Sequence, residues 1–183
     1  MLLLLGMGMP LPVVYILGAS LIAPGLMEMG IPMFEAHLFI VFFSAMSAIT
    51  PPVAVAAYTA SSIAEADPMA IGWQAVRLAV AGFVVPFIFV YQPAILLHKG
   101  WINAPWPFLS TGLGLYFISV VAEGFFKGKL TLINRLALLI PGFLLLYPGK
   151  ISDVIGFLMG TILLLPHFYN RKIPFRLAIN KKR

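Results

Sequence analysis

The chain has 183 residues, of which 61% are hydrophobic and only 10% are charged, and its mean hydropathy is +1.01. Soluble domains carry about 25% charged residues, so this composition excludes an ordinary soluble domain and indicates an integral membrane protein. Because apolar runs recur at helix length, we expect an all-α membrane fold. The sequence contains no cysteine, which excludes disulfide bonds and thiolate metal sites.

Positive charge is concentrated at the C-terminus. The formal net charge is +6, and half of the basic residues lie in the last thirteen positions: Arg171, Lys172, Arg176, Lys181, Lys182 and Arg183. A basic tail beside apolar spans is typical of the cytoplasmic side of a membrane rather than of a nucleic-acid site. We therefore expect no nucleic-acid partner and a cytoplasmic C-terminus.

The first thirty residues predict a helical hairpin that is interrupted near its start. Residues 2–5 form a helical stub, residues 6–12 (GMGMPLP) break it, and residues 13–29 are apolar with a predicted kink at Pro24. The start has neither a positive n-region nor a small-residue cleavage site, so it is not a signal peptide. It resembles the end of a helix, so we expect a C-terminal portion of a longer protein.

The next apolar run, residues 34–64, is interrupted at its centre by SAITPP at residues 47–52. Two adjacent prolines remove backbone donors and clash with the preceding turn, so we expect half-helices at 34–49 and 53–64. Within hydrocarbon such a break persists only where protein buries it or where it lines a cavity. Interrupted apolar segments are typical of substrate and ion sites in secondary transporters.

Four simpler spans follow, at residues 70–97, 108–126, 132–147 and 153–169. We expect Pro86 to kink the first span and Asp153 to be the N-cap of the last. The composition changes after Leu97, where Ala, Ser and Gly give way to Leu and Phe. We therefore divide the chain into a transporter-core part, 1–97, and a transmembrane extension with a basic tail, 98–183.

The distribution of basic residues predicts which loops face the cytoplasm. Lys127, Lys129 and Arg135 flank one turn, and the turn and the tail should be cytoplasmic. The spans then alternate correctly and place residues 65–69 on the cytoplasmic side. The broken helix therefore runs from outside to inside, and residues 1–30 fit a re-entrant hairpin that enters from outside.

We expect the hairpin tip and the helix break to face each other at one depth. Freed carbonyls, together with the hydroxyls of Ser47 and Thr50, would suit Na⁺, and the N-terminus of the half-helix starting at Val53 would suit a carboxylate. The alternative is a pair of ordinary proline kinks in packed helices. The candidate cation and substrate residues are Gly6, Gly8, Pro10, Ser47, Thr50, Pro51 and Pro52.

The ionisable residues give weaker predictions. We interpret Glu28, Glu35 and His37 as a solvated outer rim, with a proton relay through His37 as the alternative. No residues have metal-ligand spacing, and no acid, base and nucleophile converge within the apolar spans. We therefore expect neither a cofactor nor an enzyme.

Several of these motifs together resemble the large membrane subunit of the tripartite ATP-independent periplasmic (TRAP) transporters. The resemblance rests on GMGMP at 6–10, SAITPPVA at 47–54, ADP at 66–68, and GW at 72–73. It covers residues 1–97 strongly and is loose in the extension. Within the family, the chain is most similar to fused permeases that work with a TAXI-class binding protein.

The resemblance implies an elevator-type, Na⁺-driven importer of a small organic anion such as a carboxylate, located in the bacterial inner membrane. It implies as partners a periplasmic substrate-binding protein, the first permease repeat and the small membrane subunit, so this chain alone should not transport. On the resemblance, residues 6–10 would line the hairpin tip. The second cation site and the substrate cavity would include Ser47, Thr50, Pro51 and Pro52. Leu11 and Pro12 depart from relatives, which often carry threonines there. A non-transporting membrane scaffold is the competing hypothesis.

Overall fold

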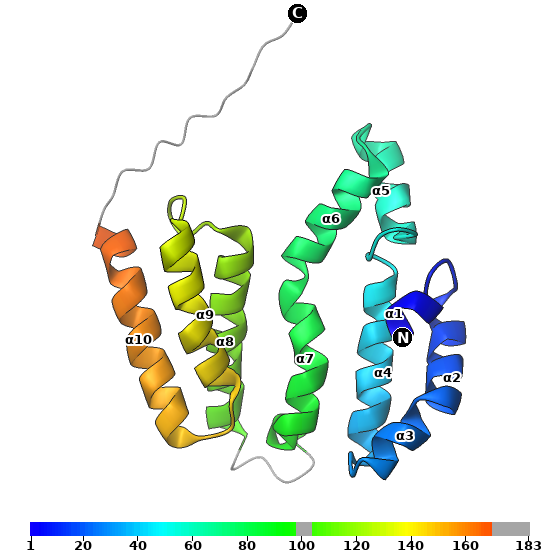
Figure 1. Ribbon diagram of the computed structural model, residues 1–183, viewed down its shortest axis with the longest axis horizontal. Helices are drawn as coiled ribbons and strands as arrows, with labels where there is room; N and C mark the ends of the chain where they lie inside the picture. The colour runs from blue at the N-terminus through cyan, green and yellow to red at the C-terminus, as the bar shows by residue number, and fades with distance from the viewer. Residues whose placement is uncertain (98–103, 170–183) are drawn as a thin grey trace, which may run out of the picture.

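The structure is a computed structural model that describes residues 1–97 and 104–169, with side chains described as far as residue 165. These residues form α-helices, one short 3₁₀ helix and no β-strand beyond an isolated bridge between Phe125 and Lys129. Figure 1 shows the longer helices standing roughly side by side in a row. The all-α prediction is confirmed for this part of the chain.

The N-terminal hairpin consists of α1 (Leu2–Leu5), α2 (Leu11–Leu21) and α3 (Ala23–Glu28). We predicted a kink at Pro24 in one helix over 13–29, but the break lies at Ile22, which separates α2 from α3. Pro24 instead occupies the first turn of α3. A proline is tolerated there because its missing N–H would have no intrahelical acceptor.

The predicted broken helix is present as α4 (Met33–Ser47) and α5 (Val55–Ala64). Residues 48–54 form the break, and the peptide bond between Pro51 and Pro52 is cis. The second half begins two residues later than predicted because Ala54 adopts a left-handed conformation with φ 33°. A β-carbon disfavours that region by roughly 1–2 kcal/mol, and Ala54 is held there while fully buried.

The predicted span 70–97 divides into α6 (Pro68–Leu78), α7 (Val80–Tyr91) and the 3₁₀ helix η1 (Pro93–Leu96). The axes of α6 and α7 differ by 42°. We expected the kink at Pro86, but Pro86 lies inside α7 and the bend is at Ala79. There the Gly82 N–H bonds to the carbonyl of Ala79, 2.8 Å away, which tightens the first turn of α7.

The C-terminal bundle consists of α8 (Pro105–Glu123), α9 (Leu132–Leu146) and α10 (Lys150–Tyr169). Its apolar core is formed by buried side chains that include Phe117, Leu138 and Leu145. Small residues let α8 and α9 approach closely, since a β-carbon on Gly114 would lie 3.0 Å from the carbonyl oxygen of Gly142. The bundle is thus packed tightly around α9.

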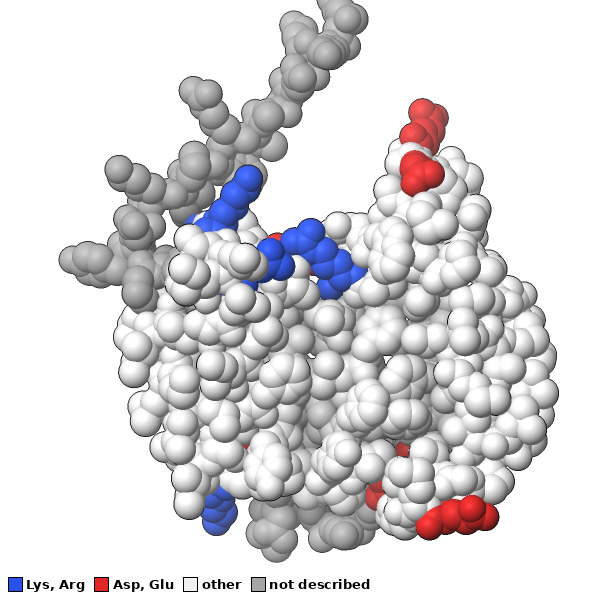
Figure 2. Space-filling model, viewed as in Figure 1, with Lys and Arg blue, Asp and Glu red and all other residues white. Residues whose placement is uncertain are grey.

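Chain reversals alternate between the two ends of the row. Residues 65–67 and the α8–α9 turn lie at one end, whereas residues 29–32 and 147–149 lie at the other (Figure 1). Figure 2 shows Lys and Arg side chains gathered over the α8–α9 turn. This arrangement agrees with the predicted alternation of loops. The predicted basic tail lies outside the described residues. The predicted boundary between residues 97 and 98 falls at the end of a described range.

By length and composition, one described helix, Pro105–Glu123, suffices to cross a membrane, or two if the bent pair α6–α7 counts as one span. At a rise of 1.5 Å per residue, the 15 residues of α9 span roughly 22 Å, which is shorter than the hydrocarbon core of about 30 Å. The expectation of about four full transmembrane helices after the broken helix therefore stays a prediction.

Candidate functional site

The hairpin tip packs directly on the end of α4. Gly6 is buried, and a β-carbon built on it would overlap Oγ and Cβ of Ser47. Gly8 follows with φ +75°, a conformation that glycine adopts freely, and its β-carbon would lie 3.5 Å from Cγ1 of Val53. The tip and the break therefore lie at one level of the molecule, between its two ends (Figure 1).

The two candidate hydroxyls are oriented by their own helix. Ser47 Oγ donates to the carbonyl of Ser44 at 2.6 Å, and Thr50 Oγ1 donates to the carbonyl of Met46 at 2.7 Å. A hydroxyl that donates its proton in this way retains two lone pairs as acceptor sites. Ser47 is buried and Thr50 is half-buried.

The break also provides uncommitted carbonyl oxygens. Ala48 and Thr50 each accept one bond across the break, from the N–H groups of Ala56 and Ala54 at 3.0 and 3.2 Å. Within the described chain, the carbonyls of Ile49, Pro51 and Pro52 receive no such bond. Hard cations bind neutral oxygens, and carbonyl oxygens freed at an interrupted helix are such ligands.

The N-terminus of α5 provides fewer free donors than we expected. The N–H of Ala56 is bonded to Ala48, and that of Ala57 is bonded to Ala54 at 2.7 Å. The remaining donors at this end are Val53 and Val55, whose N–H groups have no acceptor among the described residues. A carboxylate could therefore be bound only at this first turn.

Gly72 supports the break from behind, a contact that sequence reasoning missed. A β-carbon on Gly72 in α6 would lie 2.9 Å from Cγ of Pro51 and 3.5 Å from Cβ of Ala54. Only a glycine allows α6 to approach the break so closely. The GW pair at 72–73 contributed to the family resemblance, but nothing in the sequence indicates which helix it contacts.

The predicted site residues differ in burial. Gly6, Ser47 and Pro51 are buried, and Gly6 and Ser47 are in contact. Thr50 is half-buried. The exposed members are Gly8, Pro10, which is the N-cap of α2, and Pro52.

The predicted solvated rim is wrong for Glu35, which is only 2% exposed in the first turn of α4. Glu28 is exposed, as expected. The half-buried His37 accepts or donates a hydrogen bond through Nδ1 to the Tyr15 hydroxyl at 3.0 Å, which ties α2 to α4. Across the residues that the structure describes, no His, Asp and Glu side chains cluster as metal ligands.

Two polar contacts fasten the C-terminal bundle to the rest. The Arg77 guanidinium donates to the carbonyls of Ala122 and Glu123 at 2.7 and 2.6 Å, and so caps the C-terminus of α8. Further along the interface, Thr111 Oγ1 donates to Oε1 of Gln92 at 3.0 Å, and both side chains are buried.

Interrupted helices that meet inside the protein are a feature of many secondary transporters. A comparison with protein families agrees, because the family described as "Tripartite ATP-independent periplasmic transporter, DctM component" matches residues 1–102. This match covers more than half of the chain, and the chain belongs to that family. No curated protein and no solved structure matches the chain.

The family match confirms the resemblance seen in the sequence and defines the class of protein. The chain is a membrane-integral component of a TRAP-type secondary transporter of the bacterial inner membrane, and the family is a transporter family rather than an enzyme class. The matched residues include the hairpin, the broken helix and the α6–α7 pair. Residues 103–183 lie outside the match.

Proposed function

We propose that the chain is the part of a binding-protein-dependent, Na⁺-coupled permease that forms one wall of its transport site. The cargo is a small organic anion such as a carboxylate. The observation that carries the proposal is the packing of the hairpin tip on the break, with Gly6 against Ser47. A transport site requires two interrupted segments that meet at one level. Two unrelated proline kinks would have no reason to meet.

Sodium would bind at the end of α4. The Ser47 and Thr50 oxygens keep their lone pairs, and the carbonyls of Ile49, Pro51 and Pro52 accept no bond from the described chain. The C-terminal end of a half-helix also carries partial negative charge. Na⁺ there would stabilise the closed arrangement of tip and break, because a ligand shifts a conformational equilibrium by its difference in affinity for the two states.

The anion would bind on the opposite side of the break. The N–H groups of Val53 and Val55 have no acceptor among the described residues, and at the start of α5 the helix dipole favours negative charge. The hairpin tip would open and close over this position, with Gly6 and Gly8 as the hinge. A periplasmic binding protein would deliver the anion, and the first permease repeat and the small membrane subunit would complete the site.

The test is uptake by the complete permease, reconstituted in vesicles with its periplasmic binding protein and the ligand which that protein carries. Replacing Thr50 with Val removes one oxygen ligand while keeping the shape, so we expect Na⁺-driven uptake to need more Na⁺. Thr59→Val is the matched control, since exposed Thr59 makes the same type of bond, to Val55, within α5. Unchanged Na⁺ dependence in Thr50→Val would favour the alternative of a non-transporting membrane scaffold.

A further inference from the structure

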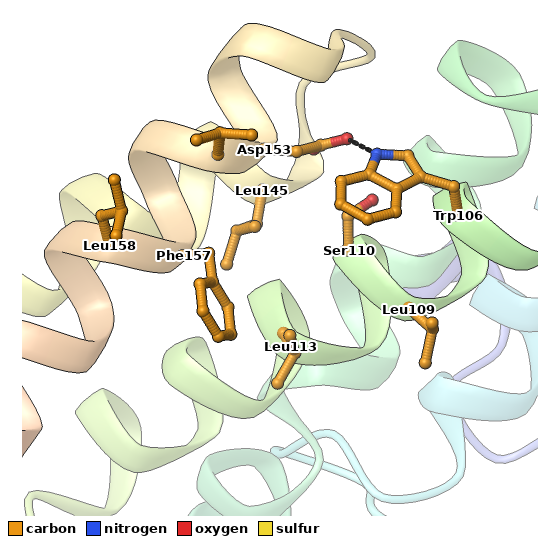
Figure 3. A pocket seen from close by; sticks show the side chains of 9 residues that line it. Trp106, Leu109, Ser110, Leu113, Leu145, Asp153, Phe157 and Leu158 are labelled. Carbon is orange, nitrogen blue, oxygen red and sulfur yellow. Dashed lines mark hydrogen bonds between the residues drawn. The ribbon is translucent and has the colours of Figure 1, made fainter.

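The C-terminal bundle contains an apolar groove that the transport proposal does not use. Helices α8 and α10 both pack extensively on α9 but make few contacts with each other. Between them is a cavity of about 390 Å³ lined by Leu109, Leu113, Leu145, Phe157 and Leu158. Figure 3 shows these side chains along the groove and Trp106 and Asp153 closing one end.

Asp153 is a buried carboxylate that lacks part of its hydrogen bonding. We predicted it as the N-cap of the last helix, but α10 begins at Lys150, so Asp153 lies inside the first turn. The side chain is 4% exposed, and its Oδ2 accepts from Nε1 of Trp106 at 2.7 Å (Figure 3). Its Oδ1 has no partner in the described part of the chain. A carboxylate offers about four acceptor sites, and a buried one without donors is costly.

A second, more polar cavity of about 550 Å³ adjoins the groove. Trp106 and Asp153 line both cavities, and Lys150, Gln92 and Tyr91 line the second one. An acidic and a basic side chain therefore both line the polar cavity at this end of the apolar groove. Trp and Lys are the residue types that anchor a protein at the level of lipid headgroups.

The chemistry of the two cavities indicates the kind of occupant. The groove is lined almost entirely by apolar side chains, whereas Lys150 and Asp153 line the adjoining cavity. A molecule with an apolar chain and a charged headgroup matches both parts. A single flexible hydrocarbon chain is thin enough to follow the slot between α8 and α10.

We propose that this site binds a phospholipid with a primary-amine headgroup. One acyl chain lies along Leu109, Leu113 and Phe157, the ammonium group donates to the Asp153 carboxylate, and the phosphate pairs with Lys150. The headgroup occupies the polar cavity, and the missing donor at Asp153 is supplied by the lipid. A lipid with a quaternary ammonium has no N–H to donate, and one with a glycerol headgroup carries no compensating positive charge.

The test is native mass spectrometry of the full chain in detergent, titrated with phosphatidylethanolamine, phosphatidylcholine or phosphatidylglycerol of identical acyl chains. We expect phosphatidylethanolamine to bind at least ten-fold more tightly than phosphatidylcholine. Asp153→Asn keeps the shape and the acceptor for Trp106 but removes the charge, so the preference should disappear. Asp67→Asn is the matched control at the opposite end, because asparagine also caps a helix, and it should keep the preference.

Further variants separate the two halves of the proposed site. Lys150→Gln should weaken binding of all three lipids without changing their ratio, since each carries a phosphate. Leu113→Trp should fill the groove and abolish binding, which provides a readout even if Asp153→Asn fails to fold. Equal binding of the lipids to the wild type, a preference that survives Asp153→Asn, or a polypeptide found in the groove would overturn the proposal.

Discussion

Gly6 in the hairpin tip lies directly against Ser47 at the end of α4, with no room for a β-carbon between them. Replacing Gly6 with Ala should therefore push the tip away from the break and destabilise the fold by about 1–3 kcal/mol, the usual cost of overpacking. Gly25→Ala is the control, because nothing lies within 4 Å of its β-carbon position. Thermal unfolding in detergent measures both.

A double-mutant cycle tests whether the contact itself is responsible. Ser47→Gly removes the atoms that the new methyl group would meet, so the cost of Gly6→Ala should be largely relieved in the double variant. If Gly6→Ala were as stable as the Gly25→Ala control, the close apposition of tip and break would be refuted.

Gly72 makes the equivalent contact from α6, and its loss should loosen the break from the other side. In Gly72→Ala the new β-carbon would lie 2.9 Å from Cγ of Pro51, which should outweigh the gain in helix propensity of roughly 1 kcal/mol. Gly112→Ala in α8, where the space is open, should be neutral or stabilising. Both variants losing the same stability would argue against a specific contact.

At the buried pair Gln92 and Thr111, replacing one residue should cost more stability than replacing both. Thr111→Val leaves Oε1 of Gln92 without its donor, and such a loss costs about 1–3 kcal/mol. Replacing both residues, as Gln92→Leu with Thr111→Val, removes the polar atoms together and should recover most of that stability. Unfolding curves of the single and double variants measure these losses of stability. If the loss in the double variant equalled the sum of the losses in the two single variants, the contact would be contradicted.

Removing both prolines should raise the Na⁺ requirement of the permease. Pro51→Ala with Pro52→Ala permits a more regular helix across the break, and its hydrogen bonds would use carbonyls that accept none within the described residues. In the complete permease, half-maximal uptake should then require several-fold more Na⁺. An unchanged Na⁺ requirement would show that the break does not hold the coupling ion.

The two chain interruptions at the candidate site could be predicted from the sequence because prolines and glycines act locally. A helix is interrupted by the double proline at 51–52 and by the glycines at 6 and 8, whatever tertiary contacts surround them. Two such interruptions in apolar runs then suggest one shared site. The contact of Gly6 with Ser47 agrees with that reasoning, while the ligands themselves stay a prediction.

The features that the sequence did not indicate depend on contacts between distant residues. Asp153 accepts from Trp106, 47 positions away, and no local pattern distinguishes this arrangement from an N-cap. The bend between α6 and α7 falls at Ala79 rather than at Pro86. Glu35 is buried although its neighbours suggest a solvated loop. Tertiary packing sets each of these outcomes.

The most direct test of the central claim is a specific stabilisation of the complete permease by Na⁺ in the absence of substrate. A ligand present at 100 times its Kd stabilises the state that binds it by about 2.7 kcal/mol. Unfolding temperature should therefore rise when Na⁺ replaces K⁺ at constant ionic strength, and this rise should be lost in Ser47→Ala with Thr50→Val but kept in Thr59→Val. An equal unfolding temperature in Na⁺ and K⁺, or a rise that survives loss of both hydroxyls, would contradict a Na⁺ site at the break.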